Sequence, residues 1–424
     1  MAGREIESFR KHVIAELRGN ILPFWLEHCL DHEHGGFIGR MSNELLIDHQ
    51  AKKGLILNAR LLWTFSTLCR SEIVGANDDS PLQLARRVYD YLEEHFWDDR
   101  FGGAFWQVDC RGTLADDKKK IYGQAFYIYA LSEYFLATGE SAALERAQTL
   151  FDLIENHSCD MANGGYIETC NRDWTAAEDV RLSDKDLNEK KSMNNHLHLL
   201  EGYTNLYRAW PDPQVADELS GLIDLFERHI LDRHTCHFGH FFNERWEKRS
   251  DTYTFGHDIE GSWLLCEAAE ALGRPELVEK TGRLAVDIAQ AVYEQGLDSD
   301  GGLFYEGKAG CVIDTNKEWW PQAEAVVGFL NAYQLSGREH FFDAALRCWE
   351  FIERAIVDHT HGEWFWRVDR DGTPDLNEPK VSEWKGPYHN TRACLETIRR
   401  LDALARIDMG GSLKSEGLGD GPQR

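Results

Sequence analysis

The sequence has 424 residues, of which 42% are hydrophobic and 28% are charged, a composition typical of globular proteins. Its 46 basic and 72 acidic residues give a formal net charge of −26. A surface this acidic repels phosphate backbones and anionic lipids, so we expect neither a nucleic acid nor a membrane partner.

The chain starts with the polar segment Met1–Lys11, and no apolar run approaches the roughly 20 residues that a membrane helix needs. The 10 cysteines are scattered singly and form no C-x-x-C pair, so they predict reduced core residues and not a disulfide framework. We therefore expect a soluble cytoplasmic protein, as a monomer or weak homodimer.

Apolar residues three and four apart predict a first helix from Ile6 to Ile21, with an end disturbed by Gly19 and Pro23. The same spacing predicts helices over 55–68, 125–136, 144–154, 197–207, 215–230, 259–272, 284–292, 323–335, 341–356 and 391–405.

A glycine–aromatic signature, typical of a tight turn and a short strand, recurs between these helices. Its copies lie at 34–37, 101–106, 163–166, 238–242, 300–305 and 361–366. Each repeat is thus a helix, a turn with a small hairpin, and a second helix. Six such pairs cannot bury their apolar faces alone. No polar capping repeat favours an open solenoid, so we predict an all-α protein, a closed ring of six helix hairpins with short β-hairpins in its loops.

Residues 1–408 should form this single domain. Residues 409–424 are rich in glycine, serine and charge, and we expect a disordered tail there.

Polar and aromatic residues open the second helix of each repeat, and same-phase positions of a closed ring converge at one end of its axis. We therefore expect one polar pocket there. The residues are Asn58, Arg60, Tyr122, Asn194, His198, His257, Glu260, Trp319, Trp320, Gln322, Glu324, Trp384, Tyr388, His389, Asn390 and Arg392.

Several of these residues also have a purely structural interpretation. His257 and Glu260 share a helix face and are a candidate acid/base pair, but such a histidine can equally be a satisfied core residue. Arg60 can form a buried ion pair, and the tryptophans can belong to the core. Asn194 and His198 share a face, whereas His196 should point elsewhere.

The densest group of possible metal ligands is His234, Cys236, His237 and His240, which lies in a turn and matches no common zinc pattern. The G-x-S-x-G elbow of acyl transfer is absent, as is a nucleotide loop. We therefore predict neither a metal nor a cofactor. Three histidines, an arginine and a glutamate suit proton transfer at a carbon next to a carbonyl, where histidine is the base and arginine holds the enediolate oxygen.

The motifs at 54–60, 121–126, 192–198, 255–260, 319–324 and 384–390 resemble those of the cellobiose 2-epimerases, within the N-acylglucosamine 2-epimerase superfamily. The resemblance covers about Arg18 to Leu404. It implies an (α/α)6 barrel and cofactor-free epimerisation, at C2, of the reducing-end glucose of neutral β-1,4 disaccharides. Cellobiose would give glucosyl-mannose and lactose would give epilactose, with slow aldose–ketose isomerisation as a side reaction.

By the same resemblance, His257 and His389 are the acid/base pair at C2, and His198 handles ring opening. Arg60 anchors the enediolate, and Glu260 orients a histidine. The expected substrate contacts are Asn58, Tyr122, Asp186, Asn194, Trp246, Trp319, Trp320, Glu324 and Trp384.

Three other functions remain open. The first is a monosaccharide enzyme of the same superfamily, an N-acylglucosamine 2-epimerase or a mannose isomerase. The second is an (α/α)6 glycoside hydrolase, which needs two carboxylates about 5 to 9.5 Å apart; Asp186, Glu260 and Glu324 are available. The third is a non-catalytic carbohydrate-binding protein. The sequence leaves open the second sugar, the direction in which each histidine acts, the isomerase-to-epimerase ratio and the role of the tail.

Overall fold

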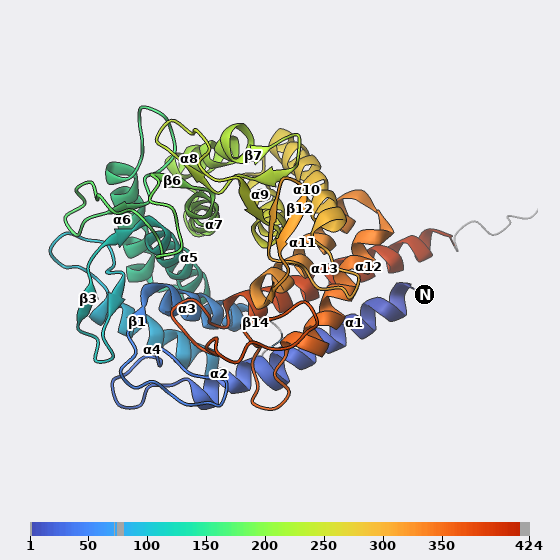
Figure 1. The fold of residues 1–424 in the computed structure, drawn as a ribbon, viewed down its shortest axis with the longest axis horizontal. Coiled ribbons are helices and arrows are strands. Elements are labelled where there is room, and N and C mark those ends of the chain that lie inside the picture. The colour runs from blue at the N-terminus through green and yellow to red at the C-terminus, as the bar shows by residue number, and fades with distance from the viewer. Residues whose placement is uncertain (1, 72, 74–79, 416–424) are drawn as a thin grey trace, which may run out of the picture.

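The computed structural model describes residues 2–71, 73 and 80–415, and its helices form two concentric rings around one axis (Figure 1). The inner ring consists of α3 (Leu55–Arg70), α5 (Ile121–Thr138), α7 (Met193–Ala209), α9 (Phe255–Leu272), α11 (Trp319–Ser336) and α13 (Tyr388–Ser415). The outer ring consists of α1 (Ala2–Glu16), α4 (Ser80–His95), α6 (Ser141–His157), α8 (Pro213–Leu225), α10 (Pro275–Gln295) and α12 (Glu339–Phe351).

Neighbouring inner helices contact each other around the ring, and contact between α13 and α3 closes it. Each outer helix packs on one or two inner helices, with α1 covering α13. The described residues therefore confirm the predicted closed ring, an (α/α)6 barrel. The first predicted helix is divided: after α1 a π-helical turn, Leu17–Ile21, leads into α2 (Leu22–His28), which has Pro23 in its first turn.

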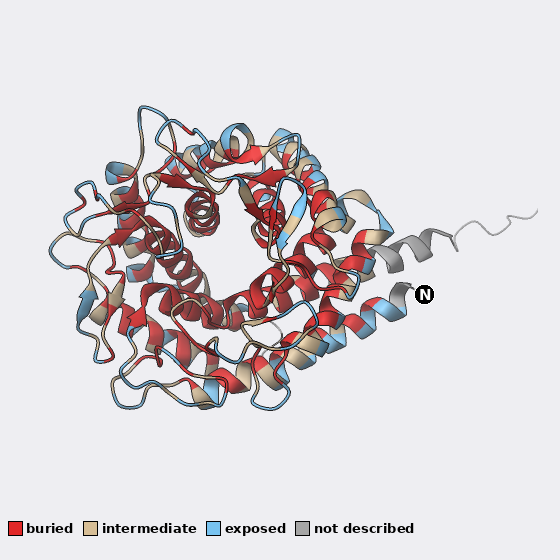
Figure 2. Ribbon diagram, in the orientation of Figure 1, coloured by how far each residue is buried: buried red, intermediate tan, exposed pale blue. Residues whose placement is uncertain are grey.

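Burial explains which helices are inside (Figure 2). Every residue of α5 from Ile121 to Tyr134 is buried, because this helix is apolar nearly all round. In contrast α4 buries one stripe, which includes Leu84, Val88 and Leu92. The helix α4 was not among those predicted, although Leu84, Val88 and Leu92 lie four apart, the spacing typical of a helix with one buried face.

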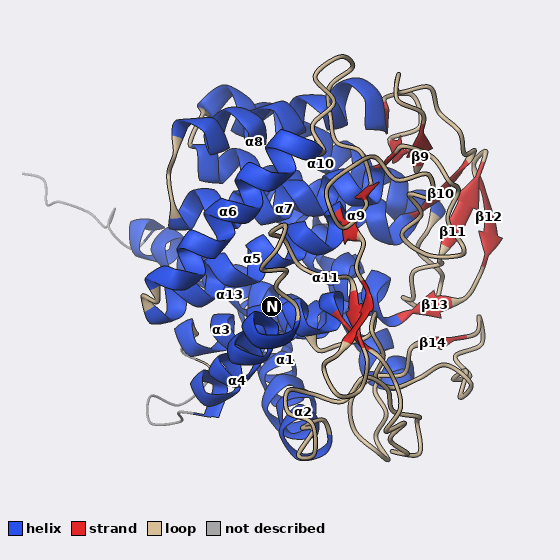
Figure 3. Cartoon of the chain, turned by 90° about the vertical axis from the view of Figure 1, so that its left-hand side faces the viewer, coloured by secondary structure: helices blue, strands red, loops and turns tan. Residues whose placement is uncertain are grey.

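Short antiparallel strands collect at one end of the barrel, where the inner helices begin (Figure 3). One sheet contains β1 (Lys53–Gly54), β2 (Gln107–Val108) and β3 (Leu114–Asp116), and another contains β10 (Thr252–Thr254), β11 (Glu306–Lys308) and β12 (Cys311–Asp314). The two-stranded pairs are β4 (Lys119–Lys120) with β5 (Thr169–Cys170), β6 (Lys191–Ser192) with β9 (Phe241–Phe242), β7 (Leu231–Asp232) with β8 (His237–Phe238), and β13 (Lys317–Glu318) with β14 (Arg367–Val368).

In five of the repeats, a buried lysine that precedes an inner helix forms an ion pair with the glycine turn of the same repeat. Each ammonium group donates to the first aspartate of its turn. The pairs are Lys53–Asp31 at 2.7 Å, Lys119–Asp98 at 3.1 Å, Lys191–Asp160 at 2.8 Å, Lys317–Asp298 at 2.9 Å and Lys380–Asp358 at 2.6 Å. The repeated motif thus positions the start of the inner helices.

The fourth repeat differs from the others, and its turn lies before the glycine–aromatic signature predicted at 238–242. Its turn is closed by pairing of Leu231 with Phe238, so Cys236 and His237 take the place of the two glycines. Cys236 accordingly adopts a φ of 58°. Tyr253 stands two residues before this inner helix, where four other repeats have their lysine, and it stacks on the His237 ring with centroids 3.7 Å apart.

The backbone of α13 continues to Ser415, beyond Met409, where the predicted tail begins; residues 416–424 lie outside the described part of the chain. The cysteines are all free thiols. Within the described residues, no helix combines the length and apolar character needed to cross a membrane.

Replacing Lys380 with methionine should destabilise the fold by about 3 kcal/mol, because Asp358 is then left buried without its counter-charge. Chemical unfolding followed by circular dichroism measures this effect. The matched control is Lys11→Met, which removes an exposed pair with Glu7 and should change stability by less than about 0.5 kcal/mol. Equal stabilities for the two variants would contradict a structural role for the lysine–aspartate pairs.

Candidate active site

A cavity of about 940 Å³ opens at the end of the barrel where the strands and the starts of the inner helices lie. Its lining includes most of the residues that the sequence predicted: Arg60, Tyr122, Asp186, Asn194, His198, His257, Glu260, Trp319, Trp320, Trp384 and His389. The predicted convergence of the repeats on one pocket is therefore confirmed for these positions.

Equivalent positions in the inner helices explain this convergence. The sixth residues of α3, α7 and α9 are Arg60, His198 and Glu260, and all three line the cavity. The second residues of α5, α7, α11 and α13 line it as well: Tyr122, Asn194, Trp320 and His389. Second and sixth residues are four apart, so they share the helix face that points to the axis.

Arg392 binds three carboxylates in the centre of the barrel. Its guanidinium donates hydrogen bonds to Glu201 and Glu260, and its Nη2 donates to Glu324 Oε1 at 2.7 Å. Arginine and carboxylates are all at most 2% exposed, and the group joins α7, α9, α11 and α13. Burial raises the pKa of Glu324, and burial together with Glu324 raises that of Glu260 to about 7.

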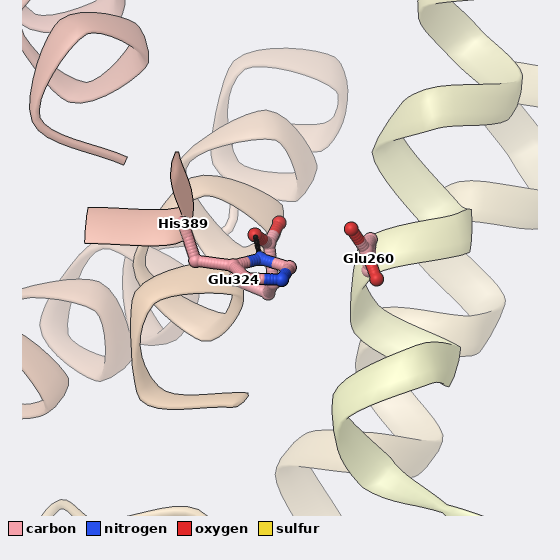
Figure 4. A group of neighbouring side chains, drawn as sticks. All are labelled: Glu260, Glu324 and His389. Atoms are coloured by element: carbon pink, nitrogen blue, oxygen red, sulfur yellow. Dashed lines mark hydrogen bonds and ion pairs between the residues drawn. The ribbon is translucent and has the colours of Figure 1, made fainter. Parts of the chain in front are cut away.

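His389 is held by this group. Its Nδ1 lies 2.7 Å from Glu324 Oε1, so we place the hydrogen there, which leaves Nε2 free for chemistry. Figure 4 shows Glu260 projecting from α9 toward His389 and Glu324. Burial, with Arg60 and Arg392 nearby, lowers the pKa of His389 well below its ordinary value.

His198 is oriented in the same way by another carboxylate. Its Nδ1 lies 2.9 Å from Glu201 Oε2, while the hydroxyl of Tyr388 donates to the other oxygen. Although burial acts to raise the pKa of Glu201, Arg392 and His198 hold it below its ordinary value. Glu201 therefore stays ionised and keeps the His198 ring fixed.

His257 has a different partner. Its Nδ1 lies 2.6 Å from the hydroxyl oxygen of Thr254, and no carboxylate of the described residues is paired with it. Burial lowers its pKa well below the ordinary value, with His240 and His198 adding to the effect. The indole of Trp320 contacts both acid/base candidates, with ring centroids 4.7 Å from His257 and 5.7 Å from His389.

Arg60 is fixed at the cavity wall. Its Nη1 donates to the carbonyl oxygen of Trp384 at 2.6 Å and its Nη2 to the hydroxyl of Tyr122 at 3.1 Å. The guanidinium also lies 4.7 Å from the ring centre of Phe126. Arg60 has no carboxylate partner among the described residues, in contrast to Arg392, so its charge is available to a ligand.

The structure corrects two of the predicted roles. Glu260 binds Arg392, and Glu324 and Glu201 are the carboxylates that orient histidines. Glu324, predicted as a substrate contact, does not line the cavity. Its second oxygen accepts a hydrogen bond from Trp263 Nε1 at 3.1 Å, so both oxygens are already occupied.

Trp246 is also not at the cavity, although it was predicted to contact sugar. Its Nε1 donates to the carbonyl oxygen of Asn163 at 3.1 Å, and its indole covers Gly165. Trp174 packs on Gly103 in the preceding repeat in the same manner, with Nε1 donating to a backbone carbonyl at 3.0 Å. Both tryptophans have positive φ, of 64° and 65°, so Trp246 is part of the repeat architecture.

Asn58 and His196 likewise have structural roles, because both form hydrogen bonds with backbone groups. Asn58 Nδ2 donates to the carbonyl oxygen of Gly54, and the residue does not line the cavity. His196 is fully buried, and its Nε2 accepts the backbone N–H of Tyr166 at 3.0 Å, so it is not a surface residue. Both are the fourth residue of an inner helix, the position from which Gln124 and Gln322 also bind backbone groups of a turn.

Glu201 and Thr254, which contact histidines of the site, were not predicted. Glu201 follows His198 by three residues, so helical spacing alone could have identified it. Thr254 stands directly before α9, where its type indicates an N-cap. Arg392 was placed among the converging residues without a role.

Glu260, Glu324 and His389 form a group whose ligand atoms lie within 4.8 Å of one another, close enough to hold a metal ion. However, Arg392 donates to both carboxylates, and His389 Nδ1 faces Glu324. The guanidinium already supplies the positive charge and the hydrogen bonds that a cation would provide, so the group does not fit a resident metal.

Comparison with known proteins identifies the family. The family model for N-acylglucosamine 2-epimerase (GlcNAc 2-epimerase) matches residues 36–393. A cellobiose 2-epimerase from Bacteroides fragilis is 44% identical over 393 residues, which cover 92% of this chain and 99% of the relative. A D-mannose isomerase from Marinomonas mediterranea is more distant, at 24% identity, with 90% of this chain and 95% of the relative covered.

Among solved structures, a cellobiose 2-epimerase from Bacillus thermoamylovorans matches with a TM-score of 0.88 at 38% identity, covering 93% of this chain and 100% of that one. Sequence and fold therefore agree over nearly the whole length, and the chain belongs to the N-acylglucosamine 2-epimerase family of sugar epimerases.

Proposed function

We propose that the protein epimerises the reducing-end glucose of neutral β-1,4-linked disaccharides at C2, by proton transfer and without a cofactor. The observation that carries the proposal is the pair His257 and His389. Both rings line one cavity, both contact the same indole, and each has its Nδ1 engaged by a neighbour. Each therefore has Nε2 left to exchange a proton with substrate.

The reaction needs an open-chain aldehyde, because only then is the hydrogen on C2 acidic. His198 lines the cavity beside Tyr122, with ring centroids 4.9 Å apart, and is suited to moving the proton that opens the sugar ring. One histidine then removes the C2 proton, and the electrons of the C–H bond pass into an enediolate. Arg60 binds the enediolate oxygen in a site with little water, where such stabilisation is strongest.

The second histidine returns a proton to C2 from the opposite side. Once the enediolate has formed, its negative charge raises the pKa of the facing histidine and favours the protonated ring. In the net reaction the first histidine gains the C2 proton and the second loses one, and exchange with water restores both. Protonation at C1 instead gives the ketose, so slow lactulose formation from lactose is an expected side reaction.

The cavity suits an uncharged sugar larger than one ring. Its volume, about 940 Å³, lies at the upper end of the range of small-molecule sites. Trp319, Trp320 and Trp384 provide aromatic faces for stacking, and the buried atoms Asn194 Oδ1 and Trp319 Nε1 have no hydrogen-bond partner within the described part of the chain. Unpaired buried groups of this kind are the ones that a sugar hydroxyl would satisfy.

A monosaccharide epimerase or aldose–ketose isomerase is the second candidate, since the same enediolate chemistry serves it. The distant mannose isomerase is the observation that favours it, but the higher identity to a cellobiose epimerase supports the disaccharide. A glycoside hydrolase fits less well, because Arg392 binds two of the three candidate carboxylates, Glu260 and Glu324, and only Asp186 of the three stays outside this group.

The test is a product analysis by chromatography and NMR with cellobiose, lactose, mannose, glucose and N-acetylglucosamine, before and after dialysis against EDTA. We expect glucosyl-mannose and epilactose as the main products, unchanged by EDTA. Turnover restricted to monosaccharides would support the second candidate, and release of glucose from cellobiose would overturn the proposal in favour of hydrolysis.

Removing either acid/base ring should stop the reaction. His257→Ala and His389→Ala should each reduce the epimerisation rate by at least about a hundredfold, the usual contribution of a general acid or base. Initial rates with cellobiose measure this, and His196→Gln, which alters a buried histidine outside the cavity, is the matched control. Near-normal turnover in either alanine variant would remove that residue from the mechanism.

The pH profile should reflect the lowered pKa of both histidines. The base must be neutral, and a pKa below the ordinary value of about 6.5 keeps it neutral to lower pH. The acid limb of kcat/KM should therefore fall below pH 6.5, with a plateau through neutral pH. An acid limb centred at or above pH 7 would contradict the site as described.

Substitutions of two tryptophans should have different effects, because Trp384 lines the cavity and Trp246 supports the fold. Trp384→Ala should raise KM for cellobiose at least about tenfold through lost stacking, whereas Trp246→Phe should leave KM unchanged and lower the unfolding midpoint. Steady-state kinetics and thermal unfolding measure the two effects. A large KM increase for Trp246→Phe would return that residue to the sugar site.

A further inference from the structure

His240 was set aside in the sequence as part of a turn cluster, yet it lies next to the acid/base pair. It stands in the loop after β8, and its ring centroid is 5.8 Å from that of His257. Between the two rings lies Thr254, the residue directly before α9. His240 does not line the cavity, so it acts on the site only through its neighbours.

The backbone contact with Thr254 shows which ring nitrogen of His240 carries the hydrogen. The backbone N–H of Thr254 donates to His240 Nε2 at 3.1 Å, so this nitrogen carries a lone pair and no hydrogen. Burial lowers the pKa of His240 to about 4, which keeps the ring neutral at working pH. Its hydrogen is therefore on Nδ1, and Nε2 is a fixed acceptor.

The hydroxyl of Thr254 is free for another use. A threonine before a helix ordinarily caps it by accepting a backbone N–H, but this side chain makes no capping hydrogen bond. Its Oγ1 lies instead 2.6 Å from His257 Nδ1 and 3.5 Å from His240 Nε2. The hydroxyl thus stands between two histidine nitrogens.

We propose that His240 is a positioning residue that, through the hydroxyl of Thr254, keeps the hydrogen of His257 on Nδ1. His240 Nε2 accepts two donors from Thr254: the backbone N–H at 3.1 Å and, in a longer three-centre contact at 3.5 Å, the hydroxyl. The lone pairs of the hydroxyl then accept the Nδ1 hydrogen of His257. Nε2 of His257 is left facing the cavity without a hydrogen, able to take the substrate proton. No proton moves along this relay; it has the role that Glu324 has for His389, with neutral groups. The inference rests on the proposed function.

Removing the acceptor nitrogen of His240 should reverse the direction of the hydrogen bond between Thr254 and His257. In His240→Leu, the Thr254 hydroxyl keeps His257 Nδ1 as its one hydrogen-bond partner among the described residues, and it then donates to that nitrogen. The neutral His257 ring must in that case carry its hydrogen on Nε2, where it blocks proton abstraction. We expect kcat to fall about tenfold, the effect of one lost hydrogen bond, with little change in KM. Thr254→Val should do the same, because it removes the hydroxyl.

Conservative variants separate a relay from general destabilisation. His240→Gln offers a carbonyl oxygen as acceptor and Thr254→Ser keeps a hydroxyl, so both should retain near-normal kcat. The double variant His240→Leu/Thr254→Val should be no slower than either single variant, since both break one connection. Circular dichroism confirms that each variant is folded. Additive losses, or no rescue by glutamine and serine, would overturn the proposal.

A second readout does not depend on the substrate. In protein labelled with ¹⁵N-histidine, the imidazole signals of His257 are assigned by their loss in His257→Gln. Wild type should show His257 with hydrogen on Nδ1, and His240→Leu should move it to Nε2. Hydrogen on Nε2 of His257 in wild type would overturn the relay. The expected tautomer together with no activity on any sugar would instead overturn the proposed function and leave the relay standing.

Discussion

The site depends on one buried arginine. Arg392 is at the centre of the barrel and binds a carboxylate from each of α7, α9 and α11. Three buried carboxylates without a cation would repel one another and take up protons. With the guanidinium between them, Glu201 and Glu324 have fixed orientations, and each in turn holds a histidine by its Nδ1. The chemistry of two rings thus rests on a guanidinium, that of Arg392, which itself does not line the cavity.

The third histidine, His257, is oriented by a hydroxyl group and not by a carboxylate. A carboxylate partner stabilises a protonated ring, whereas the hydroxyl of Thr254 merely selects which nitrogen carries the hydrogen. His257 and His389 can both lose and gain a proton, but their surroundings are unequal. In an epimerase the two faces of C2 are unequal as well, because the products differ in stability and in how the remaining sugar is held.

Much of the fold was predictable because it is repeated. The glycine turns located five of the six hairpins, and the polar residues that open the inner helices converged as expected, from Arg60 to His389. The fourth turn was misplaced because Cys236 and His237 stand where the other repeats have glycines or a close variant. Trp246 was misassigned because a tryptophan in a loop has the same sequence signature whether it stacks on sugar or covers a glycine.

The pairings across helices could not be predicted. Arg392 and Glu201 lie 191 positions apart, and nothing in either segment indicates its partner. The same holds for His240, whose role follows from one backbone hydrogen bond and one hydroxyl. Periodicity specifies which face of a helix turns inward, but the register between neighbouring helices decides which carboxylate meets which base.

The most direct test of the account is the fate of the hydrogen at C2. If cellobiose is converted in D₂O, histidine exchanges its proton with solvent between abstraction and return, so the account predicts deuterium at C2 of the epimerised product. Proton NMR of the isolated glucosyl-mannose measures it. Product that retains the original C2 hydrogen completely would contradict proton transfer between two histidines.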